Sequence, residues 1–551
     1  MFRKPRRPKT MEERKQRQID AKLEAPHPDS QELNIPFGLS LDDNLALFKN
    51  LFGNASDLLV REFSFGARQE IRVALVYIDG LSDTNSISEA ILKPFVYRSL
   101  SDDKSPILPE SAYPMIRDWL ITFGSVKEAA RINEVLDYVL TGCAALFIDG
   151  TSQVLIVVVK GWKARDVEEP KAEAFVRGPR DSFNETLRTN TALIRRRIKT
   201  PRLRFDTLKI GRMTKTDICV VYIHGLTDPA LKDEVISRLK RIDTDGILES
   251  GYLEDFIKDN PWTPFSLLDR TERPDKVAGA LLEGRVAIVI DTTPFALLVP
   301  AVFSEFLQAP EDYYESFDYI RAFRWLGLII ATFLPSVYVA LSTYHQEMIP
   351  TGLVLSMAAG REGVPFPALV EALSMEISFD FLREAGARMP RSVGQAVGII
   401  GALVLGQASV AAGIVSPIMV VIVSLAAVAS FMIPNYSSSH AIRFIRFPFL
   451  LLAGAFGLPG IFWGILVLLL HLASLRSFGV PYLYPVAPGV PGEWKDVFFK
   501  APRWMMDFRP SLLRARKIRR QAPGQMPGPP GGSSGEGDDP QIVSTGREKQ
   551  G

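Results

Sequence analysis

The sequence predicts an α/β soluble region of two similar subdomains, followed by an all-α polytopic membrane domain and flanked by disordered tails. The chain of 551 residues is 23% charged and has a mean hydropathy of +0.09, yet residues 325–475 hold only 12 charged residues in 151. Short apolar runs with similar endings recur in the N-terminal half. The low-charge third is typical of a region surrounded by lipid, so a purely soluble protein is excluded.

The two ends of the chain are predicted to be disordered. Residues 1–38 form a basic polar tail, and residues 521–551 are rich in Pro, Gly and Ser. Neither segment can bury a core. Because no apolar run follows the basic residues near the start, we expect no cleavable signal peptide and a cytoplasmic N-terminal region. The net charge of +2 gives no argument for nucleic acid as a partner.

The soluble half contains an internal repeat. The heptad Tyr77–Asp83 matches Tyr222–Asp228, and the run Gly142–Asp149 matches Gly284–Asp291 at a similar offset. Chance similarity between buried strands is the alternative. A duplication predicts two α/β subdomains with mixed sheets covered by helices. We place these subdomains at residues 39–165 and 205–310, joined by a polar linker at residues 166–204.

The soluble half has no catalytic motif. The chain has five histidines, none paired at metal-ligand spacing, and no phosphate-binding Gly-Lys-Ser/Thr loop. Aspartates end three of the apolar runs, at Asp79, Asp149 and Asp291. Such residues bind ligands in some α/β sheets but more often form turns. The sequence therefore predicts a protein that is not an enzyme and has no cofactor or metal.

The membrane domain is predicted at residues 320–478. Its uncharged stretches are long enough for spans near residues 325–343, 393–411, 414–433 and 448–474. Four spans put both ends on one side, with residues 479–520 as a cytoplasmic C-terminal segment. The distribution of basic residues conflicts with this topology, because Arg383 and Arg443 would then lie outside.

An amphipathic insert is predicted at residues 362–388, between the first two spans. Apolar residues recur every four positions on one face, namely Leu373, Ile377 and Phe381. Acidic residues recur with the same spacing on another face, namely Glu376, Asp380 and Glu384. In a symmetric oligomer these carboxylates would form an acidic ring at a pore mouth. The alternative is a helix at the membrane interface with a solvated acidic face.

Several uncharged residues of the predicted spans are candidate contacts. Polar side chains inside apolar helices need partners from neighbouring helices or from water; these are Gln395, Gln407 and Ser409. Glycines four residues apart allow close helix packing; these are Gly394 with Gly398 and Gly460 with Gly464.

Many separate motifs resemble the A subunit of the GerA spore germination family. They occur in order from about residue 40 to residue 510, and include Leu193–Arg197, Thr271–Asp275, Glu311–Tyr314, Arg361–Pro367, Arg383–Pro390, Gly401–Ala408 and Ser477–Leu483. The number of matches makes the resemblance specific. A related branch, the SpoVAF-like proteins, shares this architecture and these motifs.

The resemblance implies a multi-pass protein of the spore inner membrane whose N-terminal region lies in the cytoplasm. It also implies a permease-like B subunit and a lipoprotein C subunit as partners, and a homo-oligomeric ring, expected to be a pentamer. In that role the protein is part of a nutrient-gated ion channel that triggers germination. The alternatives are a SpoVAF-like accessory germination channel and a non-conducting signalling scaffold.

Overall fold

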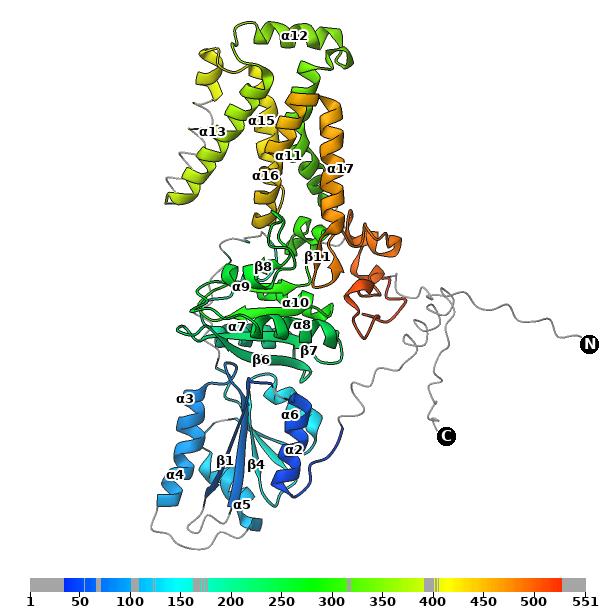
Figure 1. Cartoon of the computed structure of the whole chain (residues 1–551). Coiled ribbons are helices and arrows are strands. Elements are labelled where there is room, and N and C mark those ends of the chain that lie inside the picture. The colour runs from blue at the N-terminus through cyan, green and yellow to red at the C-terminus, as the bar shows by residue number, and fades with distance from the viewer. Residues whose placement is uncertain are drawn as a thin grey trace, which may run out of the picture.

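Three parts follow one another along the long axis of the molecule: a first sheet, a second sheet and a helical bundle (Figure 1). The computed structural model describes residues 34–53, 55–65, 71–100, 109–121, 123, 125–161, 170, 173, 177–314, 319–390, 401, 404 and 406–527. Most of the two tails predicted to be disordered therefore lies outside the described residues.

The first subdomain is a five-stranded antiparallel sheet with helices on both faces. Its strands are β1 (Leu58–Phe65), β2 (Ile71–Ile78), β3 (Val126–Ala129), β4 (Ala144–Ile148) and β5 (Val154–Val157), in the order β1-β2-β4-β5-β3. Helices α2 (Leu41–Phe52) and α6 (Ile132–Val139) cover one face. Helices α3 (Thr84–Ile87), α4 (Lys93–Leu100) and α5 (Pro109–Met115) lie on the other. Because successive strand residues point to opposite faces, β2 contributes to both cores.

The second subdomain repeats this arrangement. Its strands are β6 (Leu203–Ile210), β7 (Thr216–Ile223), β8 (Asp269–Thr271), β9 (Val286–Ile290) and β10 (Ala296–Val299), in the order β6-β7-β9-β10-β8. Helices α7 (Leu187–Arg197) and α10 (Pro274–Leu282) cover one face. Helices α8 (Pro229–Lys240) and α9 (Ser250–Ile257) cover the other. The two sheets have the same relative strand order, as the prediction of two similar subdomains requires.

The prediction of mixed sheets is wrong, because every strand pair in both sheets is antiparallel. The boundary of the predicted linker is also wrong. Part of residues 166–204 forms α7, the counterpart of α2, and the start of β6. The polar composition suggested a linker because α7 is rich in arginine. The burial of this helix depends on partners that are distant in sequence, which composition does not reveal.

The aspartates that end β4 and β9 play the same local role in both copies. The backbone N–H of Leu41, at the start of α2, donates to Asp149 Oδ1 at 3.0 Å. The N–H of Leu187, at the start of α7, donates to Asp291 Oδ1 at 2.9 Å. Each carboxylate therefore satisfies an N–H group that the first turn of a helix leaves free.

Six helices make up most of the third part. They are α11 (Ile320–Thr343), α12 (Thr351–Arg361), α13 (Ala368–Arg388), α15 (Pro417–Ser430), α16 (Tyr436–Phe456) and α17 (Leu458–Ser474). Helices α11, α15, α16 and α17 run lengthwise, α12 crosses the far end, and α13 leans away from the others (Figure 1). Among the described residues, Ile320–Thr343 and Ser437–Phe456 are long and apolar enough to cross a membrane.

The helix boundaries differ from the predicted spans. Residues 448–474 are not one helix, because the chain turns at Gly457 between α16 and α17. Gly457 has a φ of +64°, and a Cβ atom there would lie 2.7 Å from Cε1 of His345. The span at 414–433 shortens to the 14 residues of α15. The span at 325–343 lies within α11, which continues through Pro335.

Two further predictions for the bundle concern the insert at residues 362–388 and the span at residues 393–411. The insert at residues 362–388 corresponds to α13, which begins only at Ala368 after a proline. The region of the predicted span 393–411 is described only in part, since residues 391–400 lie outside the described residues. Its last residues, 406–411, are helical.

Candidate functional site

The start of α11 is held by buried ion pairs. Arg321 is fully buried and donates from Nε to Asp312 Oδ2 at 2.9 Å, while Arg324 donates to the same oxygen at 2.6 Å. Asp496, from the C-terminal segment, accepts a second bond from Arg321 at 2.7 Å. Positive charges in the first turn are unfavourable to the helix dipole, and Asp312 offsets them. The first turn of α11 is therefore fixed to two other parts of the chain.

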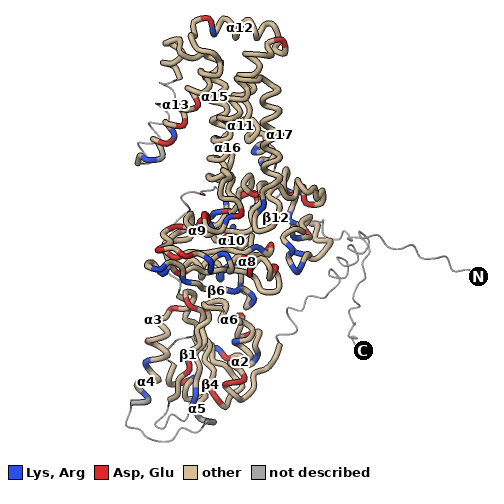
Figure 2. Tube along the Cα trace, viewed as in Figure 1, with Lys and Arg blue, Asp and Glu red and all other residues tan. Residues whose placement is uncertain are grey.

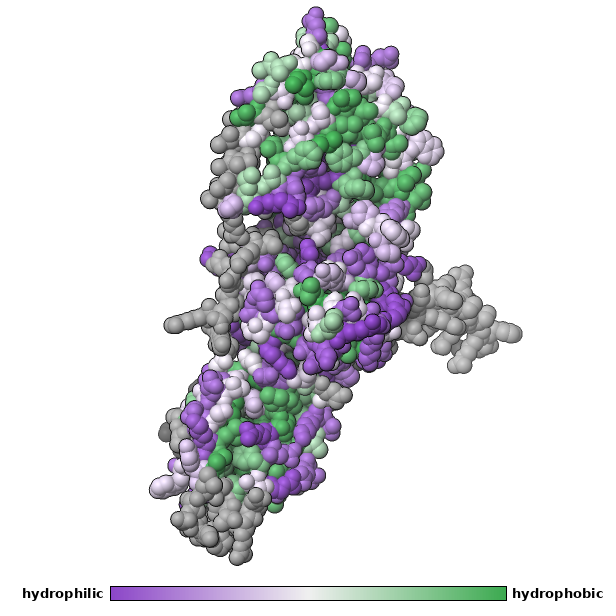
Figure 3. Space-filling model, turned by 60° about the vertical axis from the view of Figure 1, so that its left-hand side comes forward, coloured by the Kyte–Doolittle hydropathy of each residue, from purple (hydrophilic) through white to green (hydrophobic). Residues whose placement is uncertain are grey.

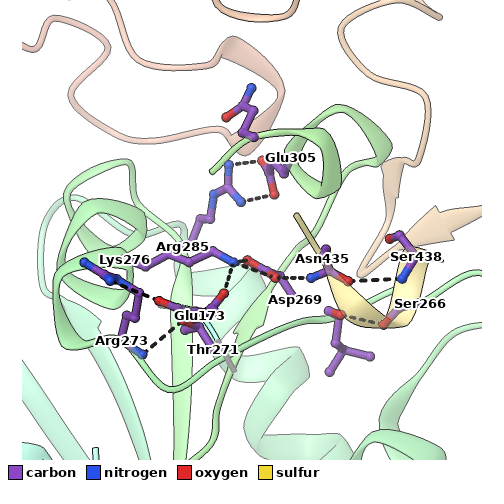
Figure 4. Close-up of polar contacts among 12 residues, drawn as sticks. Glu173, Ser266, Asp269, Thr271, Arg273, Lys276, Arg285, Glu305, Asn435 and Ser438 are labelled. Atoms are coloured by element: carbon purple, nitrogen blue, oxygen red, sulfur yellow. Dashed lines mark hydrogen bonds and ion pairs between the residues drawn. The ribbon is translucent and has the colours of Figure 1, made fainter. Parts of the chain in front are cut away.

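The start of α16 is tied to the edge of the second sheet (Figure 4). The Asn435 side chain caps the helix by accepting from Ser438 N at 3.1 Å, and its Nδ2 donates to Asp269 Oδ1 of β8 at 3.3 Å. Lys276 of α10 lies 2.8 Å from Asp269 Oδ2. Burial alone would lower the pKa of Lys276, but Asp269 and Glu173 outweigh it and raise the pKa. The lysine is therefore charged.

A third pair joins the second subdomain to the segment after α17. Arg285, at the start of β9, makes a two-bond contact with Glu305 and lies 3.2 Å from Glu283. Arg520 reaches Glu283 at 2.7 Å.

Backbone groups and a shared core complete this junction. Ala301 N donates to Ser477 Oγ at 3.0 Å, and Phe303 N donates to the Tyr482 carbonyl at 2.8 Å. One apolar core runs from the second sheet into α11, α15, α16 and α17. We call this region the junction. It comprises residues 269–314, the starts of α11 and α16, and residues 475–520. The second subdomain and the helices therefore share one close-packed interior, which can transmit strain.

Two carboxylates of the acidic stripe on α13 lie toward another helix. Glu376 is 3% exposed and forms an ion pair with Arg446 of α16. Asp380 is half-buried and lies 3.6 Å from Arg443 of the same helix. The third carboxylate, Glu384, is exposed and pairs with Arg388 within α13 at 2.6 Å. The stripe is therefore buried at Glu376 and solvated at Glu384.

The apolar face of α13 points outward instead. Phe381 is 71% exposed and Ile377 is 42% exposed, whereas Glu371 at the start of the helix is fully buried. The Glu371 carboxylate accepts from Ser416 N at 3.0 Å and lies 3.2 Å from Arg361. Helix α13 thus buries two carboxylates, Glu371 and Glu376, beside apolar residues while it exposes Ile377 and Phe381, which is unusual for a helix of a water-soluble protein. Sequence reasoning missed its arginine partners on α16, whose i, i+3 spacing was the available signal.

The glycines and uncharged polar residues predicted as helix contacts have different surroundings in the structure. Gly464 lies against α16, since a Cβ atom there would be 2.6 Å from Phe449 Cε1, and Gly460 lies against the Leu452 carbonyl. In the helical residues 406–411, Gln407 is exposed and Ser409 is half-buried. The remaining candidates lie outside the described residues, namely Gly394, Gln395 and Gly398.

Nothing in this arrangement brings together groups that could activate a nucleophile. In the part of the chain that the structure describes, no group of three or more His, Cys, Asp or Glu side chains could hold a metal ion. The arrangement instead packs a region of two similar subdomains against a bundle of apolar helices through a shared core. That combination is typical of a membrane-associated protein with a large non-membrane region.

Comparison with known proteins identifies the family. The family model described as "Bacillus/Clostridium GerA spore germination protein" matches residues 46–512. The chain is 45% identical to "Spore germination protein KA" of Bacillus subtilis (strain 168) over 89% of this chain and 90% of that protein. It is also 45% identical to "Uncharacterized membrane protein YfkQ" of the same organism, over 86% and 91%. The chain belongs to the GerA spore germination family.

One solved structure also matches, the N-terminal domain of the A subunit of the Bacillus megaterium spore germinant receptor GerK3. It is 38% identical, with a TM-score of 0.39, and the match covers 49% of this chain and 98% of that one.

Proposed function

We propose that this protein is the A subunit of a spore germinant receptor and spans the spore inner membrane several times. The single observation that carries the membrane placement is that α13 buries Glu371 and Glu376 while it exposes Ile377 and Phe381. Charges inside a bilayer face the bundle interior and pair with one another, and the apolar side faces lipid. Figure 3 shows apolar residues gathered on the surface of the bundle, above a polar soluble region.

The positions of the arginines support a cytoplasmic location for both subdomains. Helix α13 runs back toward the second subdomain, where Arg383 donates to Ser430, at the end of α15, at 3.0 Å. Charged residues of α13 become frequent toward that end (Figure 2), Arg321 and Arg324 lie in the first two turns of α11, and Arg443 lies in the third turn of α16. Basic residues favour the cytoplasmic side of a membrane. This arrangement supports a topology in which Arg383 and Arg443 lie on the cytoplasmic side.

The finer part of the proposal is that the subunit forms a homo-oligomeric ring, a pentamer, with a nutrient-gated ion path. A permease-like B subunit and a lipoprotein C subunit would complete the receptor. The buried charges of α13 and α16 support a polar path among apolar helices, because such groups mark ion pathways in membrane proteins. The continuous core at the junction supports gating by movement of the second subdomain.

The test is ion flux through the full-length protein reconstituted with its B and C subunits in liposomes. We expect nutrient-dependent potassium efflux, with altered rate or selectivity in the double variant Glu376→Gln, Asp380→Asn. The matched control is Phe381→Leu on the outward face of α13, which should behave as the wild type. Unchanged flux in the double variant would exclude the acidic stripe from the path.

A non-conducting scaffold is the second candidate, and one observation favours it. Each carboxylate of the stripe already has an arginine within 4 Å, so the stripe does not present net negative charge to a passing cation. Rings that assemble and bind nutrient but pass no ions would establish this candidate and overturn the channel.

A further inference from the structure

We propose that a cavity in the junction binds a small organic anion. The cavity has a volume of about 380 Å³ and lies between α10, residues 305–314 and the C-terminal segment. Its size falls within the range of small-molecule sites in proteins. The proposed binding is to the soluble part of the protein and does not depend on ion conduction.

The acidic groups of the cavity are already neutralised. Four carboxylates line it, and each has a basic partner within ion-pair distance: Asp269 with Lys276, Asp275 with Arg273, Glu283 with Arg520, and Glu305 with Arg285. A further cation would therefore meet no unbalanced negative charge here.

Two further arginines line the same cavity and remain unbalanced. In the described part of the chain, neither Arg503 nor Arg509 has a carboxylate within ion-pair distance. Arg503 lies over the ring of Tyr313, 4.9 Å from its centre. Arg509 donates from Nε to the Leu282 carbonyl at 2.7 Å. Burial and the neighbouring Arg520 lower the pKa of Arg509. An anion in the cavity would stabilise both charges.

Buried donors also point to a ligand with acceptor oxygens. The Nε–H groups of Arg285 and Arg520 are buried and have no acceptor among the described residues. A buried donor without a partner is unfavourable, and a carboxylate or phosphate oxygen would satisfy it. The rest of the wall includes Leu282, Leu298 and the Tyr314 side chain. The lining therefore fits an anionic group attached to a flat apolar body.

The cavity is connected to the helices by a short chain of hydrogen bonds. Gln308 lines the cavity and donates to the Asp496 carbonyl at 2.8 Å. Asp496 in turn accepts from Arg321, in the first turn of α11, at 2.7 Å. A bound anion would thus stabilise one arrangement of the junction. This regulatory consequence, unlike the binding itself, rests on the proposed function.

The glycines of the chain offer a matched pair of variants. Gly279 of α10 lines the cavity, and a Cβ atom there would have no neighbour within 4 Å. We therefore expect Gly279→Leu to be tolerated and to occupy part of the cavity. Gly352 of α12 is equally open but lies at the far end of the bundle, so Gly352→Leu is the control. Arg503→Gln removes one free charge, and Arg516→Gln, on an exposed position of the same segment, is its control.

The experiment is calorimetric titration of the full-length protein in detergent. The probes are benzene-1,3-dicarboxylate, inorganic phosphate and the neutral benzene-1,3-dicarboxamide. We expect the dicarboxylate to bind and the diamide not to bind. Arg503→Gln should weaken binding about tenfold, the loss of one charge-assisted hydrogen bond. Gly279→Leu should abolish binding, and both controls should bind as the wild type does.

The outcomes separate the inference from the proposed function. Tighter binding of phosphate, with the same variant pattern, would keep the site and assign it to a phosphate group. No binding of either anion to folded wild-type protein, or equal binding by all variants, would overturn the inference. If the protein binds the anion but shows no nutrient-dependent flux, the inferred site is supported and the proposed channel function is contradicted.

Discussion

The two α/β subdomains share one topology but meet different surroundings. In the first, the sheet is enclosed by its own helices, and its two cores contain almost only residues of that subdomain. In the second, the core beneath α8 and α9 continues into the helical bundle. A buried ion pair, Arg195 with Asp57 at 2.8 Å, joins the two copies, beside hydrogen bonds such as that from Arg204 to the Leu51 carbonyl at 2.9 Å.

One pair of equivalent positions shows how the copies diverged. Asp269 of β8 pairs in register with Leu298, and Lys127 of β3 pairs with the corresponding Ile156. Lys127 is exposed and lies over the Tyr138 ring. Asp269 is 3% exposed and contacts Lys276 and the cap of α16. The same edge strand is thus a free surface in one copy and an attachment point in the other. The comparison shows that one fold occurs with two surroundings: its edge strand is coupled to the helical bundle in the second subdomain and is not in the first.

The largest expected effect tests whether the junction stabilises the second subdomain and not the first. Asp312→Ala leaves Arg321 and Arg324 without their shared carboxylate, which we expect to cost about 3–5 kcal/mol, as for other broken buried pairs. Hydrogen exchange of the full-length protein should show lost protection in residues 303–314 and α11. Protection in β1 and β2 should be unchanged; equal loss in both subdomains would contradict the comparison.

A smaller effect is expected at the equivalent edge positions. Asp269→Ala leaves Lys276 with Glu173 as its remaining partner and releases Asn435, so we expect a loss of about 2 kcal/mol. The matched variant Lys127→Ala should change the free energy of unfolding by less than about 0.5 kcal/mol, as for exposed sites. Thermal unfolding in detergent measures both. Similar losses for the two variants would show that both edges are attachment points.

The capping aspartates should behave alike in the two copies. Asp149→Ala and Asp291→Ala each remove one hydrogen bond to the first turn of a helix, so we expect about 1 kcal/mol for each. The measurement is urea unfolding of the full-length variants. A difference of more than about twofold would mean that the copies differ in local design as well as in partners.

The smallest effect concerns acid stability. Burial alone would raise the pKa of Asp275, but the hydrogen bonds from Arg273 and Tyr314 outweigh it and lower the pKa. A lowered folded-state pKa adds stability above the unfolded value of about 4, and this stability is lost as pH falls through the folded value. Asp275→Asn should therefore destabilise the protein at pH 6 and much less at pH 3.

The matched control for acid stability lies in the first subdomain. The hydrogen bond from Arg72 lowers the pKa of Asp42, but both side chains are well exposed. Solvent screening should make Asp42→Asn neutral at both pH values. Urea unfolding at pH 6 and pH 3 measures the stability of the two variants. An equal pH response of both would contradict the expected difference between the subdomains.

The sequence alone determined the family, the duplication and the position of the apolar region, because each depends on local pattern. Strand motifs repeat where the same buried positions recur, as in Gly142–Asp149 and Gly284–Asp291. Charge is scarce over residues 325–475, which is typical of apolar helices that pack together or span a bilayer. The i, i+4 spacing of Glu376 and Asp380 also placed both carboxylates on one face of a helix.

Only the tertiary structure decided what those faces meet. Strand direction in the sheets, the burial of α7 and the turn at Gly457 depend on contacts between residues distant in sequence. Glu376 and Asp380 of α13 lie toward α16 because Arg446 and Arg443 are opposite them, 70 positions along the chain in the case of Glu376 and Arg446. A buried charge requires a partner, and no periodicity within one helix can specify where that partner comes from.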